Sequence, residues 1–158
     1  MADVSLICGK ICSGKSTFAK KLAGEKKAVI LSCDEIMTLF PPLEGDEAFG
    51  SVSEKVKRCL LQKAADIAAC GANVILDWGF WRRTERKETT VFFEEKGIPA
   101  VWYYLDISDA RWQQNIQCRN ENLGPADYYA DEGLLQKCLR LFEAPDDNER
   151  RAWRIVNQ

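Results

Sequence analysis

The segment from Gly9 to Thr17 constrains the fold of this chain more than any other. It reads GKICSGKST and matches in full the pattern G-x-x-x-x-G-K-[ST], whose backbone N–H groups surround phosphate oxygens. The pattern needs a buried strand before it and a helix after it. The apolar run 4–8 precedes the segment, and the helical stretch 16–23, ending at Gly24, follows it. The sequence therefore predicts a strand–loop–helix unit that binds a nucleoside triphosphate.

Each fixed position of the loop has a physical reason. Gly9 and Gly14 allow the backbone to turn back on itself, Lys15 reaches the β- and γ-phosphates as a point charge, and Ser16 offers its hydroxyl to Mg²⁺. Cys12 serves as a small residue inside the loop. The residues expected to bind the nucleotide are Gly9, Cys12, Ser13, Gly14, Lys15, Ser16 and Thr17.

Short apolar runs alternate with helical patterns along the rest of the chain. The expected strands are 4–8, 28–32, 73–77, 100–105 and 153–156, the last at a sheet edge. The expected helices are 16–23, 36–40, 51–70, 82–96, 106–119 with Ser108 as its N-cap, and 131–142, while 43–50 is expected to be loop. This alternation predicts an α/β protein of three layers, α/β/α, with a mostly parallel sheet of about five strands.

The length of 158 residues suits one domain, 1–158, with a short helical lid at about 119–131, where Gly124 and Pro125 interrupt a polar stretch. No apolar run approaches the roughly 20 residues that span a bilayer. The chain enters its first strand at once, without a basic and then apolar leader, so we expect a cytoplasmic protein without a membrane partner.

Composition excludes several kinds of chemistry. The chain has no histidine, and its seven cysteines include no C-x-x-C pair, so histidine triads are impossible and zinc lacks its usual ligands. The cysteines are expected to be reduced and mostly buried. A net charge of −2 gives no general reason to expect nucleic acid, although a local basic groove would permit it. The sequence does not define an oligomeric state.

Two aspartates follow predicted strands at the edge where the loop lies. Asp77 ends the run 73–77 and is expected to hold Mg²⁺ together with Ser16; capping of the next helix is the alternative. Asp34, just beyond the second strand, is the candidate base that accepts the proton of an attacking hydroxyl. Glu35 could share that role, and an N-cap role is the alternative for Asp34.

Phosphoryl transfer also needs cations around the equatorial oxygens, where charge accumulates in the transition state. Arg119, at the entrance to the lid, is the first candidate and Arg111 the second, with a solvated surface role as the alternative for both. Aromatic and basic side chains directly after Asp77 could line an acceptor pocket, with core packing or a solvated helix face as the alternative. They are Trp78, Phe80, Trp81, Arg82, Arg83 and Arg86.

Taken together, these segments resemble the small P-loop kinases of the zeta-toxin, chloramphenicol phosphotransferase and polynucleotide 5′-kinase type. The resemblance covers most of the chain and rests on the loop, LSCDEI at 31–36, VILDWGF at 74–80 with Arg86 following, YLDIS at 104–108, QCRNEN with Arg119, and FEAPDDNE from Phe142. The related kinases often carry Asp-Thr-Asn after the third strand, whereas this chain has Asp77-Trp78-Gly79.

The resemblance implies ATP-dependent transfer of the γ-phosphoryl group to a hydroxyl, with ATP and Mg²⁺ as cofactors. It places Lys15 and Ser16 at the nucleotide, Asp34 at the position of the general base and Arg119 at that of a lid arginine, so Lys15, Asp34 and Arg119 are the expected catalytic residues. The leading hypothesis for the acceptor is a small molecule such as a nucleoside, sugar or antibiotic. The alternatives are a polynucleotide 5′-kinase, or a nucleotide-binding switch or accessory ATPase without an acceptor. The chain lacks the guanine-reading N-K-x-D element and the LSGGQ signature of ABC ATPases.

Overall fold

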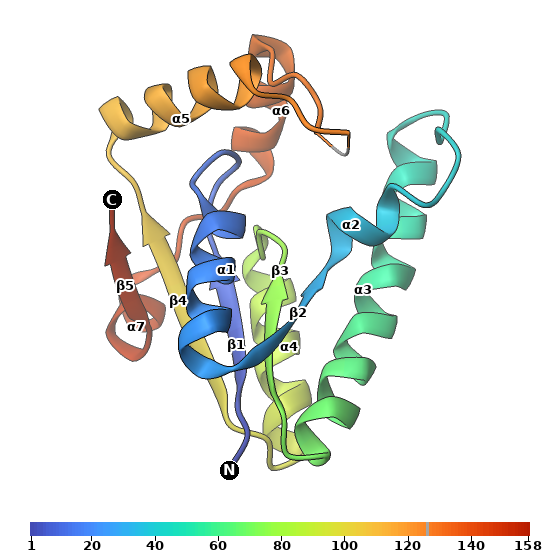
Figure 1. The fold of residues 1–158 in the computed structure, drawn as a ribbon, viewed down its shortest axis with the longest axis vertical. Coiled ribbons are helices and arrows are strands. Elements are labelled where there is room, and N and C mark those ends of the chain that lie inside the picture. The colour runs from blue at the N-terminus through green and yellow to red at the C-terminus, as the bar shows by residue number, and fades with distance from the viewer. Residues whose placement is uncertain (126) are drawn as a thin grey trace.

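The computed structural model of the protein describes residues 1–125 and 127–158, so position 126, within the predicted lid, lies outside the described residues. The strands are β1 (Val4–Cys8), β2 (Ala28–Ser32), β3 (Asn73–Asp77), β4 (Ala100–Asp106) and β5 (Arg154–Asn157). The helices are α1 (Lys15–Lys26), α2 (Cys33–Met37), α3 (Asp46–Ala69), α4 (Arg83–Glu95), α5 (Asp109–Glu121), α6 (Glu132–Leu141) and α7 (Asp147–Ala152). Figure 1 shows α5 and α6 beyond the end of the sheet to which the arrows of β1 and β4 point.

The five described strands form one sheet in the order β2-β3-β1-β4-β5, and all their pairings are parallel. Strand β1 is central, with Ser5 opposite both Ile75 and Val101. Because parallel strands end at the same edge, the loop after β1, the start of α2 after β2, and Asp77 at the end of β3 come together there. The predicted α/β fold is confirmed, including the edge position of the last strand.

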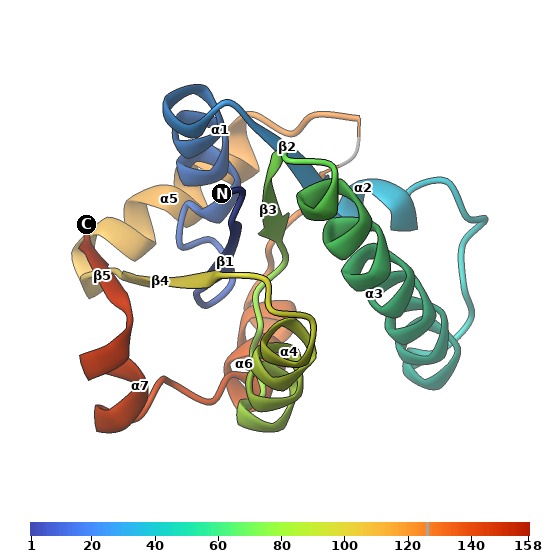
Figure 2. The same cartoon turned by 90° about the horizontal axis from the view of Figure 1, so that it is seen from below.

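Helices cover both faces of the sheet, as the alternation of side chains along the strands requires. On one face, Leu6 and Leu76 pack in a cluster with residues of α3 and α4; on the other, Ile7 and Ile75 pack against α1. Each fully buried Leu or Ile contributes about 1.5–3 kcal/mol to folding. Figure 2 shows the resulting layers, with α1 on one side of the sheet and α4 and α7 on the other.

Helix α1 runs past the glycine that the sequence predicts as its end. Gly24 lies inside the helix, at a place where an added Cβ would meet no atom within 4 Å. The helix ends where Lys27 takes a left-handed φ of 52° and donates its N–H to the Ala23 carbonyl. An internal glycine costs about 1 kcal/mol relative to alanine, which the packing of Leu22 and Ala19 offsets.

Helices α2 and α3 begin earlier than predicted. Ser32 accepts a hydrogen bond from the Glu35 N–H (3.3 Å), so α2 starts at Cys33 and not at residue 36. The predicted loop 43–50 is wrong over its second half, because α3 starts at Asp46. Asp46 and Glu47 place two carboxylates in the first turn, where the helix dipole favours them.

The remaining helices differ less from expectation, except for α7, which the sequence analysis misses. Ser108 caps α5 as predicted, accepting from the Arg111 N–H. Helix α7 starts with a capping box, in which Asp146 and Glu149 each accept from the backbone N–H of the other. This S/T/D-x-x-E spacing is a signal that the sequence does contain.

Two predictions from composition have different outcomes. All seven cysteines are free, but Cys59, Cys70 and Cys118 are exposed, so the prediction of mostly buried thiols is wrong for these three. They lie on outward-facing helix positions or helix ends. None of the helices that the structure describes has the length and apolar character needed to cross a bilayer.

Candidate active site at the carboxyl edge of the sheet

The loop from Gly9 to Thr17 leaves β1 and enters α1 with a backbone shape that depends on its residue types. Gly14 has a φ of 87° and Cys12 a φ of 59°, both in the left-handed region. A Cβ at Gly9 would lie 2.5 Å from the Ser13 hydroxyl oxygen, so the close approach there requires glycine. No side chain caps α1, and its first N–H groups are left to an anion.

Lys15 lies at the centre of the loop, half-buried. Its Nζ donates to the carbonyl oxygens of Gly9 (3.0 Å) and Lys10 (2.7 Å). Burial lowers the pKa of this amine, while the negative charges of Asp77 and Asp34 act in the opposite direction. Both carboxylates are therefore within electrostatic reach of the amine, although the three residues lie on α1, β3 and α2.

Asp77 is buried, and burial raises the pKa of its carboxyl, against the effects of the Ser16 side chain and the Lys15 charge. It does not cap the next helix, which begins after Arg82, so the alternative role for Asp77 is wrong. Magnesium usually takes one or two protein oxygens together with waters and substrate phosphates. Ser16 and Asp77 fit such a partial set; among residues 1–125 and 127–158, no cluster of three or more His, Cys, Asp or Glu could hold a metal ion.

The loop after β3 is fastened to the phosphate-binding loop. The Gly9 N–H donates to the Gly79 carbonyl (3.2 Å), and the Trp81 indole N–H donates back to the Gly9 carbonyl (3.0 Å). A Cβ at Gly79 would lie 1.9 Å from the Trp81 indole nitrogen, so only glycine fits beside this ring. Phe80 between them has a φ of 48°. This chain has Asp77-Trp78-Gly79 where related kinases often have Asp-Thr-Asn, and its Gly79 contacts the phosphate-binding loop.

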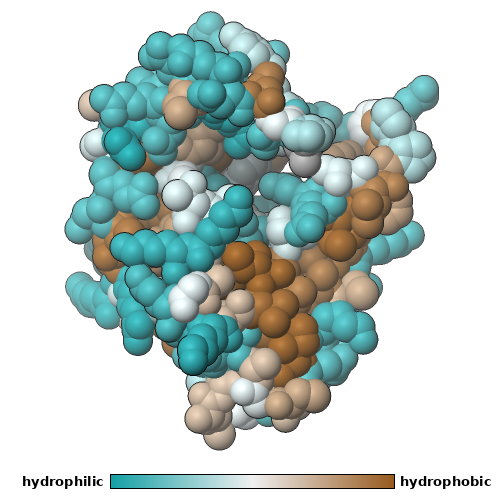
Figure 3. All heavy atoms as spheres, viewed as in Figure 1, coloured by the Kyte–Doolittle hydropathy of each residue, from teal (hydrophilic) through white to brown (hydrophobic). Residues whose placement is uncertain are grey.

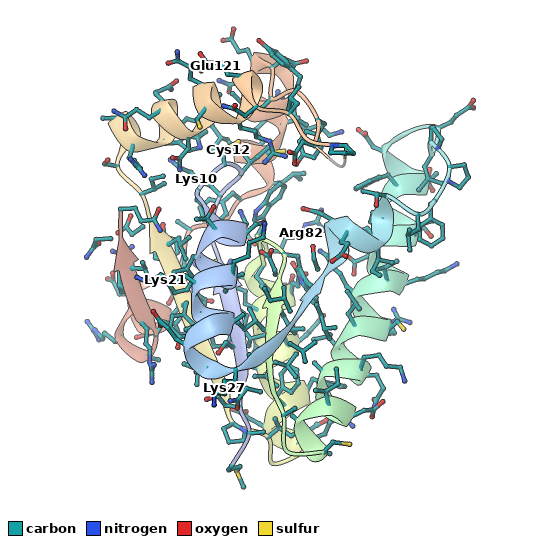
Figure 4. The ribbon with its side chains drawn as sticks, in the orientation of Figure 1. Lys10, Cys12, Lys21, Lys27, Arg82 and Glu121 are labelled. Atoms are coloured by element: carbon teal, nitrogen blue, oxygen red, sulfur yellow. The ribbon has the colours of Figure 1, made fainter. Side chains whose placement is uncertain are left out.

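Two residues of α5 hold the loop from the other side, and the sequence analysis does not identify either. The Trp112 indole N–H donates to the Ile11 carbonyl (2.7 Å), and the Asn115 amide donates to the Cys12 carbonyl (3.0 Å). The Lys10 ammonium lies 4.2 Å from the centre of the Trp112 ring. Figure 4 shows Lys10 and Cys12 on the side of the loop that faces α5. From the sequence alone, the type of a polar or aromatic residue within a helix does not predict that its side chain makes such contacts.

Arg86 and Trp78 have structural contacts in place of the acceptor role considered for them. Arg86 is 1% exposed and pairs with both carboxylate oxygens of Glu149 (2.8 and 2.9 Å). It also donates to the carbonyls of Phe80 and Trp81, which fixes the loop that carries the Trp81 indole. Trp78 is buried and stacks on Phe80 at 4.9 Å.

The other two arginines after β3 lie at the start of α4. Arg83 approaches Asp146 at 3.7 Å. Arg82 is exposed in the N-cap position of α4 and lies near the carboxyl end of β3 in Figure 4. Both side chains are exposed, so they fit the alternative of a solvated helix face, whereas the buried Arg86 does not.

Asp34 is exposed in the first turn of α2. The side chain that caps α2 is Ser32, so the alternative role of Asp34 as N-cap is wrong. Its carboxylate is free to meet a solute, and Lys15 lies within reach of its charge. Glu35 is also exposed, and its backbone N–H is the group that Ser32 caps.

On the lid side, Arg119 lies at the last turn of α5 and Arg111 near its start. Arg119 is partly buried, whereas Arg111 is exposed. Burial raises the pKa of the Cys12 thiol, and the charges of Arg119 and Lys15 act in the opposite direction. Asn115, one turn before Arg119 on α5, donates to the Cys12 carbonyl, so Arg119 lies on the side of α5 that meets the phosphate-binding loop. Figure 3 shows a hollow between the α5–α6 side and α2, rimmed largely by hydrophilic residues.

Two further hollows lie elsewhere. One of about 450 Å³ runs along the outer side of α4, and one of about 220 Å³ lies between α3 and α4. Neither is lined by a residue of the phosphate-binding loop. Lys57 and Glu85 in the smaller hollow already pair with each other at 2.9 Å. The candidate site is therefore identified by the phosphate-binding loop and the charged side chains near it, and not by the volume of a hollow.

Solved structures with the same fold include several nucleotide-binding proteins. A sugar kinase from Janibacter sp. has 20% identity and a TM-score of 0.66, with 99% of this chain and 86% of that chain covered. The APS kinase of Mycobacterium tuberculosis, in complex with AMPPNP and APS, has 18% identity and a TM-score of 0.62, with 99% and 88% covered. Kti12 of Chaetomium thermophilum, in complex with ADP-AlF3, has 12% identity and a TM-score of 0.70, with 98% and 88% covered.

Fold and loop together define a P-loop protein of kinase-like architecture. The family described as AAA domain matches residues 4–145, and the chain belongs to this family. No curated protein matches the chain at a significant level. At 12–20% identity, the solved structures establish the fold and leave the acceptor to be argued from this chain's own residues.

Proposed function

We propose that the protein is an ATP-dependent phosphotransferase that moves the γ-phosphoryl group to a hydroxyl of a small molecule, such as a nucleoside, a sugar or an antibiotic. One observation carries the proposal: Asp77 at the end of β3 and the exposed Asp34 at the start of α2 lie at the same edge of the sheet as Lys15 and its loop. A protein that only binds nucleotide needs the first of these carboxylates. An exposed second carboxylate across the site is what an attacking hydroxyl requires.

The donor side consists of the loop and the start of α1. The uncapped N–H groups of α1 and the Lys15 amine bind the phosphates, because both present positive charge to the same concavity. Ser16 and Asp77 would hold Mg²⁺, which neutralises charge on the β- and γ-phosphates when bound. Trp81, Trp112 and Asn115 hold the loop at Gly9, Ile11 and Cys12, so its backbone needs little reorganisation on binding. The Lys15 amine, which donates to the Gly9 and Lys10 carbonyls, turns from them to the phosphates.

On the acceptor side, Asp34 orients the hydroxyl and accepts its proton. The hydroxyl oxygen forms a bond to the γ-phosphorus while the bond from that phosphorus to the bridging β–γ oxygen breaks, and ADP leaves with the bridging electron pair. Arg119, which lies on the side of α5 that meets the loop, stabilises the charge on the equatorial oxygens. The proton, the phosphoryl group and the leaving electrons are then all accounted for.

Asp34→Asn tests the acceptor half directly. The amide keeps the size of the side chain but cannot take the proton, so phosphoryl transfer should fall by about 10²–10⁴-fold. ATP affinity, measured by titration, should stay within about twofold because the phosphates contact the loop. Glu35→Gln is the matched control, since Glu35 is exposed on the same helix turn, and it should keep most activity.

The main competing function, an accessory ATPase without an acceptor, makes a different prediction for these variants. ATP hydrolysis by the parent protein would then proceed with no phosphorylated product. A transfer rate of Asp34→Asn near that of the parent protein would contradict the assignment of the base.

A further inference from the structure

Arg119 has an unusual environment for an arginine at a helix end. Within residues 1–125 and 127–158, its Nε is the one buried side-chain nitrogen or oxygen that has no hydrogen-bond partner. Its nearest counter-ion is Asp127, at 3.9 Å from Nη2, and that carboxylate also accepts from the Gly124 N–H at 2.9 Å. A buried unpartnered donor is costly. The guanidinium therefore has hydrogen-bonding capacity left for a ligand at the loop.

The Tyr128 ring holds this guanidinium. The central carbon of the Arg119 guanidinium lies 4.6 Å from the centre of the Tyr128 ring, which is the geometry of a cation–π contact. Burial raises the pKa of the Tyr128 phenol, the charge of Asp34 adds to the rise, and that of Arg119 opposes it. Tyr128 thus contacts the arginine of the lid directly, at a place where the charge of Asp34 also acts.

We infer that Tyr128 is the positioning residue for Arg119: its ring face fixes the plane of the guanidinium so that the unpartnered Nε side is presented to the phosphoryl group in transit. This inference rests on the proposed function for the identity of the ligand. The chemistry belongs to the ring face and not to the phenol hydroxyl, because the contact that the structure records is between the guanidinium and the ring.

The physical basis is orientation. An arginine has several rotatable bonds, and a cation that must stabilise a transition state acts only when it is held in place beforehand. Asp127 alone cannot hold it, because a partly exposed pair at 3.9 Å is weak. Without the ring, Arg119 would be free to turn toward Asp127 and solvent, and the γ-phosphoryl position would lose its cation.

The test uses the full chain with Mg²⁺ and compares its affinity for ADP plus aluminium fluoride, which imitates the transferring phosphoryl group, with its affinity for ADP alone. In Tyr128→Leu this preference should fall by roughly tenfold. Tyr128→Phe keeps the ring face and should keep the preference. Tyr129→Leu is the matched control, because the contact between Arg119 and an aromatic ring is made by Tyr128 and not by its neighbour, and it should change nothing.

A double-mutant cycle separates positioning from an independent role. If Tyr128 acts through Arg119, then Tyr128→Leu should add no further loss in an Arg119→Ala background. An additive loss, or a loss in Tyr128→Phe as large as in Tyr128→Leu, would overturn the inference. The readout needs no acceptor, so it succeeds or fails independently of the search for a phosphorylated product that tests the proposed function.

Discussion

The phosphate-binding loop and the lid differ in how firmly the rest of the protein holds them. Three side chains, from the segment after β3 and from α5, donate to carbonyls of the loop, those of Gly9, Ile11 and Cys12. The lid turns back on itself through paired hydrogen bonds between Asn120 and Ala130, and its aromatic side chains are exposed. The donor half of the site is thus built in advance, whereas these hydrogen bonds of the lid join lid residues to one another.

This difference fits the tasks that the two regions would have. A phosphate site gains from rigid donors, because dipoles already in place need no reorganisation when charge arrives. A lid must open to admit an acceptor and close to exclude water. One ion pair, Lys137 of α6 with Asp46 of α3, joins the lid side to the acceptor side at 2.5 Å. The comparison predicts large effects from changes at the loop and small effects from changes at the lid surface.

The largest effect on ATP affinity is expected at the metal position. Asp77→Asn should reduce the gain in ATP affinity that Mg²⁺ provides on the order of tenfold or more, because a neutral amide is a weaker ligand. In the parent protein, burial raises the pKa of Asp77 above 3.8, so its carboxyl stays protonated to a higher pH than usual. The Mg²⁺-dependent part of ATP affinity should therefore rise as pH rises through that raised pKa. Titrations with and without Mg²⁺ between about pH 4 and 8 measure this.

The Asp77→Asn variant supplies the control for that pH dependence, because it removes the titrating group. Its Mg²⁺ effect should be nearly flat once the ionisation of ATP itself is subtracted. The same slope in both proteins would show that another group controls binding of the metal.

An intermediate loss of ATP affinity is expected when one of the hydrogen bonds that hold the loop in place is removed. Trp81→Phe keeps an aromatic ring but loses the N–H that donates to the Gly9 carbonyl, a loss worth about 1 kcal/mol. ATP affinity should fall by roughly fivefold, as measured by calorimetric titration. Trp153→Phe is the matched control: Trp153 stacks on Trp102 at 4.7 Å, so this change should lower Tm without changing ATP affinity. Equal losses of ATP affinity in both variants would contradict the fastening role.

The smallest effect on ATP affinity is expected at the ion pair between Lys137 of α6 and Asp46 of α3. Lys137→Gln removes a pair between half-exposed and exposed side chains, which is worth about 0–1 kcal/mol. ATP affinity should change by less than about twofold, as should that of Lys63→Gln, which breaks an exposed pair within α3. A loss of ATP affinity in Lys137→Gln as large as that in Trp81→Phe would show that the lid, like the loop, is held in place before the nucleotide binds.

Local chemistry made much of the fold predictable. The strand–loop–helix unit follows from the glycines and the lysine of one segment, and Ser108 caps α5 as its residue type suggests. The errors have two sources: helix α7 was missed although the sequence contains its capping box, and elsewhere the folded backbone overrides a local signal. Gly24 looks like a helix end yet lies inside α1, because the backbone turns at Lys27 instead.

The site was less predictable than the fold, for a physical reason. The loop and the aspartates at strand ends can be found, because parallel strands bring their carboxyl ends together. The contacts of Trp112 and Asn115 with the loop join residues about a hundred positions apart, and nothing local marks them. Arginine side chains usually lie at the surface. Arg86 is buried because it pairs with Glu149, which lies 63 positions away in the sequence.

The central claim, that a donor site is paired with a base for an acceptor, is tested most directly by following the γ-phosphoryl group. The protein is incubated with γ-labelled ATP, Mg²⁺ and a cell metabolite extract, with Asp34→Asn in parallel, and labelled products are identified by mass spectrometry. The account predicts label on a hydroxyl of a small molecule with the parent protein and almost none with Asp34→Asn. Release of all the label as inorganic phosphate, at equal rates in both proteins, would contradict it.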